Sequence, residues 1–156
     1  MPQVLKPELR ERIVGAALEV FAAHGYVGAT MGTIAQRAGL GTASLYRYYP
    51  GKAELFAAAM PADLVERFDA LLKHRVRALA TSFDVNDSSG EEMLRFWIAH
   101  RLSVVILLDR AEGTAYAHFG EQFVATLVQL TLEQLAATNP GFELDQPGRF
   151  VVRRIF

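Results

Sequence analysis

The chain has 156 residues and a net charge of −1, and 51% of its residues are hydrophobic, which is enough to build a globular core. It contains no cysteine, which excludes disulfides, thiol chemistry and cysteine-based metal sites. Residues 1–12 lack the apolar core of a signal peptide, and the apolar run over residues 104–108 is too short to span a bilayer. We therefore expect a cytoplasmic protein without a membrane partner.

Charge is distributed unevenly along the chain. Residues 1–60 carry six Lys/Arg against four Asp/Glu, an excess of +2, whereas residues 61–156 carry ten against thirteen, an excess of −3. A mildly positive N-terminal part on an acidic body is expected from this difference.

A first helix is predicted for residues 10–24, because apolar residues recur there at spacings of three and four. These residues are Ile13, Ala17, Leu18 and Phe21. Gly25 follows as a C-terminal stop.

A second helix is predicted to begin after Thr30, whose hydroxyl can cap it. Ile34, Ala35 and Ala38 then share one face at helical spacing. The helix is expected to stop at Gly39, because glycine adopts the left-handed conformation without steric cost.

A third, short helix is predicted for residues 42–48, with Leu45 facing inward and Pro50 ending it. Its outward residues combine hydroxyls, phenols, a guanidinium and one small side chain, a mixture suited to phosphate oxygens and base edges. They are Thr42, Ala43, Ser44, Tyr46, Arg47 and Tyr48. Two short helices around a glycine-bearing turn, braced by a first helix, are the layout of a helix-turn-helix DNA reader.

Residues 8–60 resemble the TetR family of bacterial repressors. The resemblance is carried by Phe21, Gly25 and Tyr26, then Ala29-Thr30, Ile34-Ala35, Ala38-Gly39-Leu40, Leu45-Tyr46, Tyr48-Tyr49 and Lys52. It implies an all-α protein in which residues 1–52 form the DNA-binding domain and residues 53–156 a partial effector-binding and dimerisation domain. The last long helices of the family are lacking, so the C-terminus looks incomplete.

The resemblance also implies roles for individual residues. Thr42, Ala43, Ser44, Arg47 and Tyr48 are placed near bases or phosphates, Tyr46 and Lys52 on the DNA backbone, and Thr30 at a helix cap beside a phosphate. Gly41 and Gly51 replace serines that are frequent in the family, so a weaker cap is expected for the helix over residues 42–48. Alternatively, Tyr49 is a core aromatic residue, and Arg47 and Lys52 are ordinary surface charges.

The remainder of the chain is predicted to be helical. An alanine-rich helix over residues 53–60 leads to Pro61, where a kink or break is expected, and then to an amphipathic connector. Ser89 and Glu92 form a predicted capping box for a helix over residues 91–108, which is apolar on nearly every side and so expected to be buried centrally. The remaining predicted elements are a short segment over 112–119, a helix over 121–138 that ends at 139–141, and a helical start over 146–156.

A small-molecule pocket is a further expectation for the body, because aromatic walls with a few polar groups are typical of such sites. The candidate residues are Trp97, His100, Arg101, Tyr116, His118, Phe119 and Phe123. The alternative is that these residues pack in the core or face solvent.

An enzyme is not expected, because the chain has no Glu-x-x-His pairs, no Ser/His/Asp arrangement and no glycine-rich phosphate loop. No catalytic residue, metal or cofactor is therefore predicted. A protein-interaction module that has lost DNA binding is a second alternative. The preferred interpretation is a repressor that binds a palindromic double-stranded DNA operator as a homodimer and is released by a small-molecule effector of unknown identity.

Overall fold

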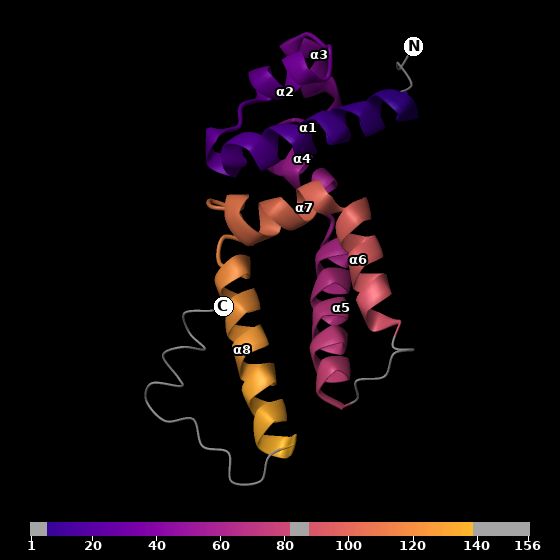
Figure 1. Ribbon diagram of the computed structural model, residues 1–156. Helices are drawn as coiled ribbons and strands as arrows, with labels where there is room; N and C mark the ends of the chain where they lie inside the picture. The colour runs from indigo at the N-terminus through magenta and orange to yellow at the C-terminus, as the bar shows by residue number, and fades with distance from the viewer. Residues whose placement is uncertain (1–5, 82–87, 139–156) are drawn as a thin grey trace. The chain divides into compact units, whose positions relative to one another are not determined.

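Figure 1 shows the computed structural model, which describes residues 6–81 and 88–138. Every regular element in these two ranges is a helix, which confirms the predicted all-α fold. The elements are α1 (Pro7–Gly28), α2 (Met31–Arg37), α3 (Thr42–Tyr48), α4 (Lys52–Ala59), α5 (Ala62–Thr81), α6 (Ser89–Ala99), α7 (Arg101–Val105), the π-helix η1 (Ile106–Arg110) and α8 (Phe119–Thr138).

The helices pack as two units that are not continuous in sequence. Of the described residues, the first comprises 6–65 and 100–119, and the second comprises 66–81, 88–99 and 120–138. The division by packing therefore differs from the predicted boundary after residue 52, because α4, α7 and η1 belong with the N-terminal helices. The functional division of the chain at that residue stays a prediction.

In the first unit, α2 and α3 lie on one side of α1, and α4 and α7 lie on the other (Figure 1). The core between them is built from the apolar residues that recur at helical spacing along each helix. Ile13, Phe21, Ile34, Leu45 and Leu55 are all fully buried. The predicted inward face of each short helix is thereby confirmed.

Gly25 interrupts α1 as the sequence indicates. Its φ of 70° and ψ of 165° are non-helical and lie in a region that favours glycine. A short turn continues to Gly28, and the amide of Ala29 donates to the carbonyl of Gly25 at 3.1 Å. The main helix therefore ends where predicted, with one added turn before α2.

The turn between α2 and α3 is a Schellman motif centred on Gly39. Gly39 has φ 67°, its amide donates to the carbonyl of Gln36 at 3.1 Å, and the amide of Leu40 donates to the carbonyl of Ala35 at 2.8 Å. These bonds satisfy two carbonyls that the end of α2 would otherwise leave without partners. The predicted stop at Gly39 is confirmed, and α3 then spans the residues expected.

Pro61 separates α4 from α5, as expected from its missing amide and its bulky ring. Helix α4 ends at Ala59, and Met60 has a non-helical φ of −125° and ψ of 67°. The carbonyl of Pro61 then accepts from the amides of Leu64 and Val65, which starts α5. The predicted kink or break is a break.

The single helix predicted for residues 91–108 is wrong. His100, with φ −117° and ψ 27°, separates α6 from α7, because residues 100–119 pack in the first unit and α6 in the second. The expected central burial also fails for α6, where Leu94 and Ile98 are 59% and 63% exposed. Only beyond the break, at Ile106 and Leu107, are the aliphatic side chains fully buried.

The second unit has an aromatic core around Phe68 of α5, which is fully buried. Its ring stacks on Phe96 and Phe123, at centroid distances of 5.6 Å each, and meets the edge of Trp97 at 6.4 Å. These contacts connect α5 with α6 and α8. The amphipathic stripe predicted after Pro61 is thus the packing face of α5.

The predicted capping box at Ser89 is wrong. Ser89 lies inside the first turn of α6 instead of preceding it, and its buried hydroxyl accepts from Nη1 of Arg75 at 3.2 Å. The tertiary contact with α5 therefore decides the position of this serine. Helix α8 matches its prediction within two residues at the start, while the elements predicted for residues 139–141 and 146–156 lie outside the described residues.

Candidate nucleic-acid interface

Helix α3 presents a polar face to solvent, as a recognition helix requires. Its residues Thr42, Ala43, Tyr46 and Arg47 are exposed, and Tyr46 has 49% of its surface accessible. Arg47 Nη2 lies 3.0 Å from the hydroxyl of Ser44, to which it donates one turn back along the helix. Hydroxyl, phenol and guanidinium groups thus stand together on one surface.

The end of α3 contacts the start of α1, which the sequence did not indicate. The phenolic oxygen of half-buried Tyr48 accepts from the backbone amide of Lys6 at 3.4 Å. The guanidinium of Arg10 lies over the ring of Tyr49, 5.6 Å from its centroid. Tyr49 is 4% exposed, which confirms the core interpretation of this residue. The backbone of Lys6 and the guanidinium of Arg10 therefore lie against the C-terminal end of α3.

Helix α3 begins without a side-chain cap. Gly41 occupies the N-cap position with φ −73°, and no side-chain hydrogen bond is made there. Gly51 stands in the same position before α4, also without a side-chain cap. That this makes the start of each helix less stable than a serine cap would stays a prediction.

Thr30 caps α2 together with Thr33. The hydroxyl of Thr30 accepts from the amide of Thr33 at 3.1 Å, and the hydroxyl of Thr33 accepts from the amide of Thr30 at 3.1 Å. This reciprocal pair is a capping box with threonine in the position more often held by Glu or Gln. The cap predicted for Thr30 is confirmed, whereas the role of Thr33 was missed although its spacing was visible in the sequence. A phosphate contact by Thr30 stays a prediction.

Lys52 points back toward the end of α1. Its ammonium donates to the carbonyl oxygens of Tyr26 at 2.7 Å, Ala29 at 3.0 Å and Val27 at 3.4 Å. It also lies 4.4 Å from the ring centroid of Tyr26. The negative end of a helix dipole and a ring face both attract a cation. The predicted backbone contact of Lys52 with DNA stays a prediction, but its ammonium has protein acceptors here.

Tyr26 belongs to an aromatic cluster that includes one predicted effector residue. Its ring is 5.8 Å from that of Phe21 and 5.0 Å from that of Phe56, and Phe56 lies 6.5 Å from Tyr116. Tyr116 therefore packs within the first unit, on the helices that carry the candidate interface. Sequence spacing could not show this, because the four rings come from three separate segments.

The seven predicted effector residues divide between the two units. Trp97 and Phe123 lie in the second unit, where both contact Phe68. The other five belong to residues 100–119 of the first unit. They are His100, Arg101, Tyr116, His118 and Phe119. A shared effector pocket for all seven stays a prediction.

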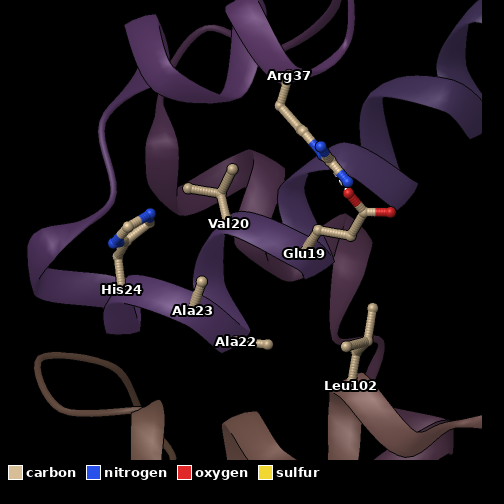
Figure 2. A pocket seen from close by; sticks show the side chains of 7 residues that line it. All are labelled: Glu19, Val20, Ala22, Ala23, His24, Arg37 and Leu102. Carbon is tan, nitrogen blue, oxygen red and sulfur yellow. Dashed lines mark hydrogen bonds and ion pairs between the residues drawn. The ribbon is translucent and has the colours of Figure 1, made fainter.

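A surface groove of about 490 Å³ lies along α1 in the first unit (Figure 2). Residues of α1 form most of its lining, with Arg37 from α2 and Leu102 from α7. Nε of Arg37 donates to the carboxylate of Glu19, an ion pair that ties α2 to α1. None of the predicted effector residues lines this groove.

Two general features of the described residues bear on function. Within residues 6–81 and 88–138, no group of three or more His, Asp or Glu side chains is arranged to hold a metal ion. None of the helices in the same ranges combines the length and apolar character that a bilayer crossing requires.

The short helices α2 and α3, their glycine turn and the bracing helix α1 define a helix-turn-helix domain. The family model "Bacterial regulatory proteins, tetR family" matches residues 13–59, which span α1 to α4. This domain belongs to the TetR family of bacterial regulatory proteins.

Curated relatives match this chain mainly at its N-terminal end. The transcriptional regulator TtgW of Pseudomonas putida is 43% identical over 53 residues, which are 34% of this chain and 40% of TtgW. The repressor KstR of Mycolicibacterium smegmatis is 38% identical over 63 residues, 40% of this chain and 30% of KstR. MftR of Mycobacterium tuberculosis, a transcriptional regulator by name, is 31% identical over 113 residues, 67% of this chain and 54% of MftR. The chain thus spans about half or less of these relatives.

A solved structure supports the fold over nearly the whole chain. A TetR-like transcriptional regulator from Rhodococcus sp. RHA1 aligns with a TM-score of 0.57 and 24% identity, covering 98% of this chain and 80% of that protein. The all-helical fold is therefore shared beyond the helix-turn-helix domain.

Proposed function

We propose that this protein is a transcriptional repressor that binds double-stranded DNA through α3. The single observation that carries the proposal is the exposed polar face of α3, on which the Arg47 guanidinium and the Ser44 hydroxyl are 3.0 Å apart. A helix of this kind enters the major groove with its side chains toward base edges. The family assignment of residues 13–59 supports this use of the face.

Individual roles on this face follow from chemistry. Arg47 is the candidate for bidentate contact with a guanine, and Thr42 and Ser44 offer hydroxyls to bases or phosphates. Ala43 permits close approach or contact with a thymine methyl group. Tyr48, which is half-buried, is proposed to lie near bases or phosphates, and the exposed Thr30 and Tyr46 to contact the DNA backbone.

The proposed assembly is a homodimer on a palindromic operator. Helix-turn-helix dimers place their recognition helices about 34–36 Å apart, so that both reach successive major grooves. One domain alone makes too few phosphate contacts for firm binding at physiological salt. Analytical ultracentrifugation of this chain, with and without operator duplex, tests the stoichiometry; one protomer per half-site at saturation is expected, and one per whole operator contradicts the dimer.

The helices after α4 are proposed to bind a small-molecule effector that releases the DNA. Trp97 and Phe123 each contact Phe68 in the second unit, and Tyr116 packs on Phe56 in the first, so that aromatic side chains are available to a ligand in both. An effector acts only through its differential affinity for the DNA-binding and released states. We propose that the protein acts in the cytoplasm as a regulator and has no catalytic activity.

DNA binding itself is tested by gel shift on a random duplex and on a duplex selected from a random pool. Affinity should fall linearly on a double-logarithmic salt plot, with a slope of about −0.9 per phosphate contact. The selected duplex should also be preferred over the random one. Salt-independent or absent binding contradicts the proposal and favours a protein-interaction module or an enzyme.

A further inference from the structure

We propose that Lys52 is a positioning residue that closes the helix-turn-helix on itself and thereby sets the angle of α3, instead of neutralising a phosphate. This inference rests on the proposed DNA-binding function. It assigns to Lys52 a role that its neighbourhood in the sequence does not show.

The hydrogen bonds of the ammonium carry the inference. A lysine ammonium has three donors, and three carbonyl oxygens lie within reach of Nζ of Lys52, at 2.7, 3.0 and 3.4 Å. They belong to the last turn of α1 and the residue after it, where carbonyls lack partners in the helix. A phosphate contact by this ammonium would require giving up acceptors that it already has.

The carbonyl groups that accept from Lys52 lie just before α2 in the chain. Tyr26, Val27 and Ala29 immediately precede Thr30, the N-cap of α2. Lys52 begins α4, four residues after the end of α3. One side chain therefore joins the segment that enters the helix-turn-helix to the segment that leaves it.

The surroundings of Lys52 make this junction firm. Its ammonium sits 4.4 Å from the ring centroid of Tyr26, and that ring packs on Phe56, 5.0 Å away, from the same helix as Lys52. Lys52 is half-buried, so its charge–dipole contacts are screened less than those of an exposed lysine. Loss of the ammonium leaves carbonyls near Tyr26 without a partner and loosens the start of α2.

The test compares three variants of the full 156-residue chain with wild type. Lys52→Met removes the charge and the donors at similar length, Lys52→Arg keeps both, and Lys52→Gln keeps amide donors without charge. Lys73→Met is the charge-matched control, because Lys73 pairs with Asp69 on α5, outside the helix-turn-helix. The probes are a consensus duplex selected by the wild-type protein and a random duplex of equal length, each titrated over a range of salt.

A positioning role predicts that Lys52→Met weakens binding to the consensus duplex on the order of tenfold. Affinity for the random duplex and the salt slope should stay at the values of the Lys73→Met control. Lys52→Arg should restore consensus binding, and Lys52→Gln should restore part of it. If Lys52→Met does not unfold cooperatively, the comparison of Lys52→Gln with Lys52→Arg decides, because a phosphate contact needs the charge and a carbonyl contact needs only the donor.

A slope that falls by about 0.9 per half-site in Lys52→Met or Lys52→Gln, with equal losses on both duplexes, would overturn the inference and leave DNA binding intact. Lower thermal stability with an unchanged ratio of consensus to random affinity would overturn it too, since the residue would then be structural only. Absence of salt-dependent binding by the wild-type protein would overturn the proposed function and this inference with it.

Discussion

Arg47 and Ser44 form a hydrogen-bonded pair one turn apart on the outer face of α3, with Nη2 of the guanidinium 3.0 Å from Oγ of the serine. The bond restricts where the guanidinium can point before DNA arrives. Lower side-chain freedom in the free protein reduces the entropy lost on binding. The two residues are therefore expected to act together in base readout.

The first prediction follows from this pair. Arg47→Ala should relax the preference at one position in each operator half-site by about 1–3 kcal/mol, the range for a bidentate contact with guanine. Selection of binding sites from random DNA by the variant measures this directly. Ser44→Ala leaves the guanidinium but removes its hydrogen-bond partner. It should weaken the base preference at the same operator position by less than Arg47→Ala does. An unchanged consensus in the Arg47 variant would remove this residue from base readout.

The second prediction concerns the cap of α2. Thr30→Ala removes the hydroxyl that accepts from the amide of Thr33, and should lower the free energy of unfolding by about 0.5–2 kcal/mol. Thr30→Ser keeps the acceptor and serves as the matched control. Urea denaturation followed by circular dichroism gives both values. Equal stabilities of the two variants would show that the capping box contributes nothing measurable.

The third prediction uses two glycines with similar backbone conformations and different surroundings. Gly39 has φ 67° with no atom within 4 Å of an added Cβ, whereas at Gly113, with φ 82°, an added Cβ would lie 3.3 Å from Cγ2 of Val27. Gly39→Ala should therefore cost only the left-handed strain, about 1–2 kcal/mol. Gly113→Ala should cost up to about 1 kcal/mol more, because the side chain of Val27 must also give way. Thermal unfolding of both variants checks the order, and a reversed order would refute this account.

The fourth prediction concerns the second unit. Phe68 is fully buried against three aromatic rings, so Phe68→Ala should lower the free energy of unfolding by about 3–5 kcal/mol. Trp97, whose side chain is 42% exposed, is the control, and Trp97→Ala should cost less. If Trp97 forms part of an effector pocket, its variant should instead lose ligand-induced thermal shift in a compound screen. A larger destabilisation from Trp97 than from Phe68 would contradict the described core.

Much of the helix-turn-helix was predictable, because its signals are local. Gly39 and Pro50 end helices through their own backbone chemistry, and Leu45 is placed inward by spacing alone. The same approach failed at His100, which divides a predicted single helix and has no intrinsic tendency to end one. Nothing within four residues of His100 indicates that residues 100–119 pack with the N-terminal helices.

The sequence by itself therefore determined which residues form the short helices, which face of α3 is polar, and to which family the domain belongs. Tertiary structure alone decided the partners of Lys52, which lie 23 to 26 residues earlier in the chain, and the packing of Tyr116 on Phe56. The physical reason is that a pattern in the sequence reflects interactions between residues that are close together in the chain. Caps, turns and helical spacing involve residues at most four apart, whereas the choice of a distant carbonyl or ring depends on how whole helices pack.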